Sequence, residues 1–333
     1  MRIIIILIVL TCVCIQEGNA QVRPQQRHIY FMGLGPSGFM GDLGGANQIG
    51  TQGIRDFDFQ AIRPTIQAGY RYFLSHEFAV SGRLSFGHLT GNDKHTQEPF
   101  RNNRNLSFRA QLLEFSAKGE WFFFSYGRAG ARFSNHVLNT GRTGATLRTY
   151  IFGGIGGFYF NPQGYFRREH YLTLQHASVT NPDLLPENGW FNLRNLGTEG
   201  QGLPGYPDNP QYSSVNVTFP IGLGMVIRIN RNWSIGMEYG LRTTLTDYID
   251  DVSTSYIDPS IFRSIFPDDP ARAALGEFFS NPTNYSQGSA PTMPGLQRGN
   301  PENNDSYMFL IFSLQFTPFV QPGSPWWAPF IQR

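Results

Sequence analysis

The chain has 333 residues and a formal net charge of only +2, with Lys and Arg scattered along it, which argues against a nucleic-acid-binding protein. Charged residues make up 15% of the chain, below the roughly 25% usual for soluble domains. The aromatic share of 15% includes 29 Phe and 15 Tyr. This composition indicates extended apolar surfaces that face something other than water.

The first 20 residues predict a signal peptide for export. Arg2 supplies the positive start, residues 3–15 form an apolar stretch, and small residues precede a cleavage site after Ala20. Both cysteines, Cys12 and Cys14, lie inside this segment, so we expect no disulfide and no thiolate chemistry in the mature chain. Beyond it, no run approaches the ~20 continuous apolar residues that a membrane helix needs.

Alternation of apolar and polar residues with period 2 predicts β-strands along the exported chain. The first candidate covers residues 28–43, and a hairpin follows over 64–91 with its turn at 75–77. In the next candidate, 105–124, the alternation changes phase near Leu112 and Leu113, which predicts a β-bulge there.

The next predicted strand is the glycine-rich stretch LRTYIFGGIGGFYFNP at 147–162. We expect its glycines to relieve crowding and its Phe and Tyr side chains to face lipid or the membrane interface. A second hairpin follows, with strands over 215–229 and 233–242 and a turn at 230–232, and the last candidate covers 305–319. Glycines on the inward face of this hairpin are expected to make room for larger inward side chains.

Eight such strands predict an all-β fold, an eight-stranded antiparallel transmembrane up-and-down β-barrel, over residues 21–320. A soluble β-sandwich explains alternation equally well, but it predicts charge on the outward faces, which here carry none. Short turns are expected in the periplasm, together with a long basic turn at 125–146 and a Pro- and Trp-containing tail at 321–333. The long extracellular loops are expected at 44–63, 92–104, 161–212 and 246–304.

Alternation also predicts a set of charged side chains inside the barrel. They are Arg71, Arg83, Arg109, Glu114, Lys118, Glu120, Glu238 and Arg242. One hypothesis is a path for ions or solutes. The other is a lumen plugged by paired charges, which the narrow interior of an eight-stranded barrel favours.

An acidic group stands where a strand enters an outer loop. It consists of Asp247, Asp250, Asp251 and Asp258. Carboxylates suit Ca²⁺, but this spacing is not that of an EF-hand loop. We therefore expect solvated acids, and the sequence predicts no metal, no cofactor and no small-molecule substrate.

A further set of residues outside the strands is suited to docking a partner at the periplasmic side. It consists of Arg128, Arg132 and Arg142 in the basic turn, and Trp326 and Trp327 in the tail. For the two tryptophans, anchoring in the membrane interface is slightly favoured, and docking remains the open alternative.

Five segments resemble, in the same order, the Bacteroidetes outer-membrane barrels of the DUF6089 family, which includes the PorG-like component of the type IX secretion system. They are RNLSFRAQLLEFSA (104–117), YIFGGIGGFYFNP (150–162), LGTEGQGLPGY (196–206), TDYIDDVSTSYID (246–258) and QRGNPENNDSYMF (297–309). The resemblance implies a non-catalytic outer-membrane protein that anchors a periplasmic ring of PorK- and PorN-like proteins in the secretion and gliding machinery.

Two other functions remain open. One is a small barrel whose long loops bind a ligand or adhere outside the cell. The other is an enzyme that modifies lipid A, for which His88 near Ser85 and Asp93 is the candidate group; that spacing is no established nucleophile motif.

Overall fold

The computed structural model describes residues 27–43, 61–93, 104, 106–126, 146–230, 232–284 and 292–318. The predicted signal peptide, most of the basic turn and the tail lie outside this part of the chain. Eight long strands and one short strand are described, together with three short helices and a 3₁₀ turn. The strands are β1 (His28–Met40), β2 (Arg63–Phe73), β3 (Phe78–Asn92), β4 (Ser107–Tyr126), β5 (Thr146–Phe166), β6 (Gly189–Asn192), β7 (Val215–Arg228), β8 (Trp233–Thr244) and β9 (Ser306–Phe316).

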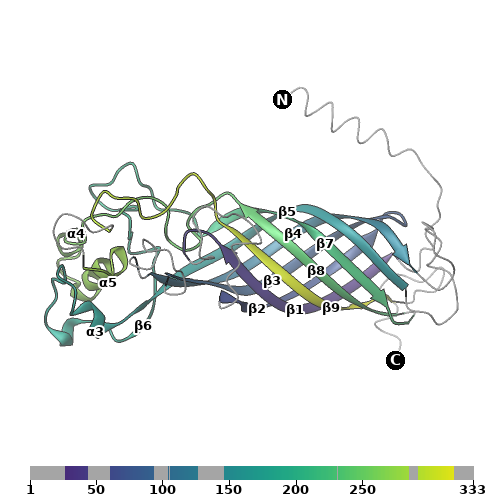
Figure 1. Cartoon of the computed structure of the whole chain (residues 1–333), viewed down its shortest axis with the longest axis horizontal. Coiled ribbons are helices and arrows are strands. Elements are labelled where there is room, and N and C mark those ends of the chain that lie inside the picture. The colour runs from purple at the N-terminus through teal and green to yellow at the C-terminus, as the bar shows by residue number, and fades with distance from the viewer. Residues whose placement is uncertain are drawn as a thin grey trace, which may run out of the picture.

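The eight long strands close into a barrel (Figure 1). Each pairs antiparallel with its neighbours in the order β4-β3-β2-β1-β9-β8-β7-β5, and pairing of β4 with β5 closes the cylinder. Because closure leaves no unpaired edge, every strand satisfies its backbone hydrogen bonds within the sheet, as a chain in lipid must. The predicted eight-stranded antiparallel barrel is confirmed.

The two ends of the barrel differ. At one end, called the turn end here, short turns join β2 to β3 and β7 to β8. At the other, the loop end, connections 167–214 and 245–305 fold into a cap that contains β6 (Figure 1). The helical elements of the cap are α3 (Arg168–Tyr171), η6 (Pro182–Leu184), α4 (Ile261–Ile265) and α5 (Pro270–Ser280). None of the helices in the described part of the chain is both long and apolar enough to cross a membrane.

The outer wall of the barrel carries exposed apolar side chains. Leu34 is 67% exposed, Phe115 62% and Ile221 60%. On β4 the apolar outward row runs from Leu113 to Phe123, roughly 33 Å along a strand or roughly 25 Å in height at the usual tilt, which matches the apolar band of membrane barrels. We call this surface the apolar belt.

The inner face of β4 shows how the lumen is layered. Phe108, Ala110 and Leu112 point inward at the loop end, Glu114 to Glu120 point inward at mid-barrel, and Phe122 points inward at the turn end. Alternation is unbroken across this strand up to Trp121, after which the register shifts before Phe124. The bulge predicted near Leu112 and Leu113 is therefore wrong, because the inward face changes from apolar to polar without a change of phase.

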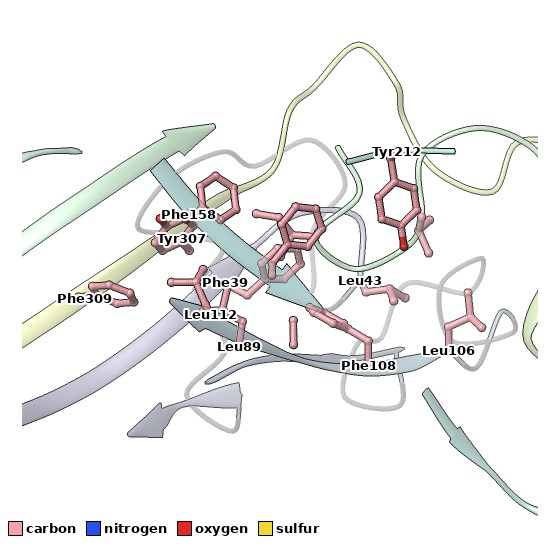
Figure 2. Close-up of a cluster of buried hydrophobic side chains, with 14 of the residues drawn as sticks. Phe39, Leu43, Leu89, Leu106, Phe108, Leu112, Phe158, Tyr212, Tyr307 and Phe309 are labelled. Carbon is pink, nitrogen blue, oxygen red and sulfur yellow. The ribbon is translucent and has the colours of Figure 1, made fainter. Parts of the chain in front are cut away.

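Two buried apolar clusters enclose the polar middle of the lumen. The loop-end cluster gathers residues from the strands and from the cap, including Phe39, Phe108, Phe158 and Tyr307 (Figure 2). The turn-end cluster includes Phe73, Phe122, Tyr150 and Phe152. A third cluster lies inside the cap and contains Phe166, Tyr171 and Phe278.

The aromatic residues of the glycine-rich strand β5 correct a prediction. Phe152, Phe158 and Phe160 point inward and are buried, and of the Phe and Tyr between 147 and 162 only Tyr159 lies on the outer wall. The inward glycines do make room, as predicted: a Cβ on Gly222 or Gly240 would come within 2.7 Å of the Phe152 ring. Small residues on β7 and β8 thus accommodate large ones on β5.

Candidate functional site

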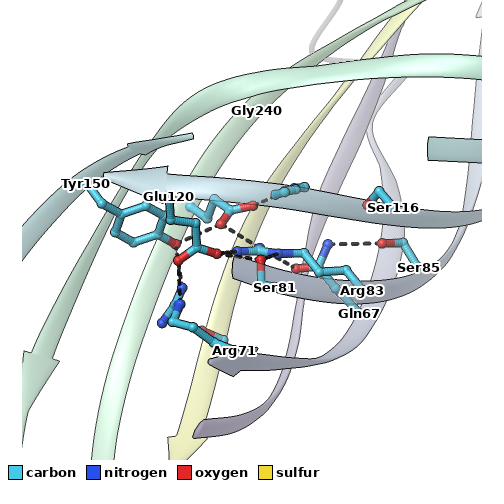
Figure 3. A network of polar contacts seen from close by, with 12 residues as sticks. Gln67, Arg71, Ser81, Arg83, Ser85, Ser116, Glu120, Tyr150 and Gly240 are labelled. Carbon is cyan, nitrogen blue, oxygen red and sulfur yellow. Dashed lines mark hydrogen bonds and ion pairs between the residues drawn. The ribbon is translucent and has the colours of Figure 1, made fainter. Parts of the chain in front are cut away.

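Buried charged side chains of the described chain form a network at the middle of the lumen (Figure 3). All the predicted interior charges except Arg109 belong to it and are buried. They are Arg71, Arg83, Glu114, Lys118, Glu120, Glu238 and Arg242.

Two carboxylates link three cations in a continuous chain. Glu120 accepts from Arg71 at 2.5 Å and from Arg83 at 2.6 Å. Glu238 contacts Arg83 at 2.5 Å and Lys118 at 3.0 Å. Arg83 therefore joins both halves, and the low-polarity surroundings strengthen each contact.

A separate pair lies closer to the loop end. Glu114 accepts from Arg242 Nε at 3.1 Å, from the Tyr307 hydroxyl at 3.0 Å and from Ser116 Oγ at 2.8 Å. Tyr150 donates its hydroxyl to Glu238 at 2.7 Å. Each lumen carboxylate thus has several donors, as a buried charge requires.

This arrangement decides between the two hypotheses for the interior. Arg71 and Arg242 are among the largest fully buried side chains of the protein. A continuous water-filled path would leave such guanidinium groups in contact with water. The described lumen is therefore filled by paired side chains between apolar layers, and the path hypothesis has no support in it.

Arg109 does not join this network. It lies on β4 in phase with the outward residues, its Nε donates to Gln163 Oε1 at 2.9 Å, and its guanidinium stacks 4.2 Å from the Trp190 ring centroid. The prediction that it points inward is wrong for the same reason as the predicted bulge. Without a phase change at Leu112, odd-numbered residues of β4 remain on the outer wall.

The acidic group is not solvated as predicted. Asp247, Asp250 and Asp251 are buried, and only Asp258 is exposed. Asp251, which has a left-handed φ of 65°, accepts from the Tyr212 hydroxyl at 2.6 Å. Asp251 therefore links its own segment to Tyr212 and Thr198 inside the cap.

Asp247 is the exception within this group, because neither of its carboxylate oxygens accepts a well-aligned hydrogen bond among the described residues, and only the nearby Ser253 side chain opposes the effect of burial. Burial and the neighbouring Asp42 carboxylate raise the pKa of Asp247 to about 9. Burial also raises the pKa of Asp250 and Asp305, with neighbouring carboxylates adding to the shift. Within the described ranges, no three His, Cys, Asp or Glu side chains group so as to hold a metal ion.

The segments that carry the family resemblance meet in the cap. Glu199 accepts from Arg298 at 2.8 Å and from the backbone of Ser253 at 3.0 Å. Arg104 pairs with Asp93 at 2.8 Å and also donates to the Arg298 carbonyl. These buried pairs were not predicted, because alternation locates strand residues only and gives no information about contacts between loops.

The candidate catalytic group does not assemble. His88 lies on the outward face of β3, where its ring contacts Phe86, whereas Ser85 is buried on the inward face and bonded to Gln67. Asp93 is paired with Arg104. A nucleophile and its base must lie within hydrogen-bond reach of each other. Ser85 and His88 are on opposite faces of β3, so the barrel wall separates them.

The candidate docking residues lie outside the described residues. They are Arg128, Arg132, Arg142, Trp326 and Trp327. They stay predictions.

No protein-family model matches the chain, and no curated protein matches it. Among solved structures, it is similar to the attachment invasion locus protein Ail of Yersinia pestis at 8% identity and a TM-score of 0.32, covering 88% of this chain and 98% of that one. It is similar to neisserial surface protein A at 6% identity and a TM-score of 0.32, covering 87% of this chain and 96% of that one. It is also similar to the N-terminal β-barrel domain of Pseudomonas aeruginosa OprF at 9% identity and a TM-score of 0.27, covering 87% of this chain and 97% of that one. Similarity this low assigns no function, and the barrel class rests on the strand pairing.

Proposed function

We propose that the protein is a non-catalytic integral outer-membrane barrel that acts as a PorG-like anchor for the periplasmic ring of the type IX secretion machinery. The observation that carries the membrane location is the apolar belt around a closed barrel. The plugged lumen supports an anchor over a pore, since the described interior offers no aqueous path. The secretion role is supported by the resemblance of five segments to the PorG-containing family.

The cap and the turn end have different tasks in this proposal. The resemblance segments around Glu199 and Arg298 are occupied with each other inside the cap. Contact with a periplasmic ring is therefore assigned to the turn end, to which the basic turn at 125–146 and the tail from residue 321 are connected.

Deletion of the basic turn tests this division. We expect a chain lacking 127–145, or the tail, to reach the outer membrane folded but to lose ring proteins in a pull-down analysed by mass spectrometry, and to impair cargo secretion. As a matched control, residues 285–291 of a loop-end connection are replaced by Gly and Ser. Normal ring capture and secretion in both deletions would contradict the anchor proposal.

The second candidate function is a small barrel whose long loops bind a ligand or adhere outside the cell. The packed cap favours it. The buried cluster around Phe166, Tyr171 and Phe278 gives the long loops a core of their own, as a recognition surface would need. Secretion unchanged by the turn-end deletions, together with loss of surface binding on replacement of cap loops, would support this function. The lipid A-modifying alternative predicts altered lipid A in S85A or H88A, which the separation of these two residues argues against.

A further inference from the structure

A pocket of about 480 Å³ opens beside the loop end of the barrel. Its walls come from the loop-end parts of β2, β3 and β4 and from the extension where β6 pairs with β5. Arg63, Arg109 and Arg167 line it, together with Tyr165 and Trp190. We call it the arginine pocket.

The lining of the arginine pocket has one sign of charge. Three guanidinium groups contribute to it, and no carboxylate does among the described residues. None of the ion pairs found in the described ranges includes Arg109 or Arg167. The guanidinium groups of Arg109 and Arg167 carry like charges that repel each other, so an anion in the pocket would relieve this repulsion.

Arg109 is held in place before any ligand arrives. Its ring partner Trp190 lies 4.2 Å away, and Gln163 accepts from its Nε. Gln163 is in turn fixed by a hydrogen bond of 2.8 Å to Asn192 on β6. Nε is the only atom of this guanidinium that has a hydrogen-bond partner among the described residues, so its terminal nitrogens are available for the paired hydrogen bonds that phosphate oxygens accept.

The height of the pocket identifies the source of the anion. On β4 the outward row changes from apolar Leu113 to Gln111 and then to Arg109. Arg109 lies about 13 Å along the strand beyond Leu113, or roughly 10 Å higher at the usual tilt. This height is at the outer edge of the headgroup layer, which extends roughly 5–8 Å beyond the hydrocarbon core, and a long Arg side chain can reach down into it.

We propose that the arginine pocket binds a phosphate group on the headgroup of a lipid in the leaflet that surrounds the loop end. Arg109 and Arg167 hold the phosphate from the barrel wall and from the β5–β6 extension, and Arg63 contributes charge from β2. Tyr165 and Trp190 flank the headgroup. This inference rests on the outer-membrane location proposed above and is independent of the secretion role.

Lipid retention tests the proposal directly. The protein is reconstituted into nanodiscs of digalactosyldiacylglycerol, a lipid without phosphate, that contain bisphosphorylated lipid A or its dephosphorylated form, and the lipid that remains bound is counted by native mass spectrometry. We expect the phosphorylated form to be retained preferentially. This retention should fall at least about tenfold in R109Q/R167Q, because each of the two substitutions removes charge-assisted hydrogen bonds. The control R263Q is matched to the single variant R167Q: it removes one charge from exposed Arg263 of α4, outside the pocket, and should retain lipid like the original protein.

Further variants separate the outcomes. R167Q alone changes an exposed side chain and keeps the test valid if R109Q folds poorly by circular dichroism, and R109K keeps the charge but loses the paired hydrogen bonds and should be intermediate. Equal retention of dephosphorylated lipid, or no change in R109Q/R167Q, would overturn the site. Displacement of lipid A by millimolar inorganic phosphate would overturn the lipid source in favour of a free anion. Failure to enter nanodiscs would instead contradict the proposed location.

Discussion

Arg242 of β8 and Glu114 of β4 meet across the lumen, with Nε 3.1 Å from Oε2. Removing one partner leaves the other charged and buried, and E114Q should destabilise the barrel by about 3–5 kcal/mol. Replacing both by residues without charge, in E114Q/R242M, should recover most of this loss. Urea unfolding in lipid vesicles measures both effects, and a double variant less stable than E114Q would contradict the uncompensated-charge explanation.

Gly224 lies beneath the Tyr150 ring, and a Cβ there would overlap the ring. Because Tyr150 is held by Glu238 and by Arg71, it has little freedom to move. We expect G224A to cost about 1–3 kcal/mol, as overpacking does. The matched control is G153A on β5, where a Cβ would meet nothing within 4 Å; its urea midpoint should stay near that of the original protein.

The filled lumen predicts that the barrel does not conduct ions. In planar bilayers, the protein should show no stable open level, because paired charges and two apolar layers occupy the cross-section. Insertion is verified independently by protease protection in the same lipid. A steady ohmic conductance would contradict the filled lumen and would support the hypothesis of an ion path through the barrel.

The raised pKa of Asp247 predicts a pH dependence of the cap. Between its ordinary value of 3.8 and about 9, the folded protein binds a proton here that the unfolded chain releases. Stability from this group is therefore full at low pH and falls as pH rises through this window, by at most about 1.4 kcal/mol per pH unit. Hydrogen exchange of the cap should report faster opening at pH 9 than at pH 6.

Asp247→Asn tests the origin of that slope. The amide keeps the shape but cannot ionise, so D247N should stabilise the cap at alkaline pH and flatten the dependence. Asp258, exposed in the same loop, is the matched control, and D258N should keep the slope of the original protein. An equal effect of both variants would assign the slope to other groups, such as Asp250 and Asp305.

Alternation predicted the strands because it reflects a local rule, that neighbouring side chains point to opposite faces. It failed where the inner face was apolar too. At Phe108, Ala110 and Leu112 a buried layer imitates the outer wall, and hydrophobicity alone cannot distinguish lipid from a packed core. This one ambiguity produced the false bulge and the inward placement of Arg109.

The charge network was predicted as a set of residues but not as pairs, since which cation meets which carboxylate depends on barrel curvature. Contacts in the cap, such as Glu199 with Arg298, join loops that carry no periodic signal. The arginine pocket was missed for a similar reason. Arg63 and Arg109 come from β2 and β4 and Arg167 directly follows β5, and only the closed sheet brings them together.

The seam between β1 and β9 places Tyr30 beside Phe316, so the first strand of the barrel is hydrogen-bonded to the last. No partial chain can complete the cylinder, because a barrel lacking its final strand presents two open edges to solvent or lipid. Closure of the sheet must therefore wait until both the first and the last strand are available for pairing.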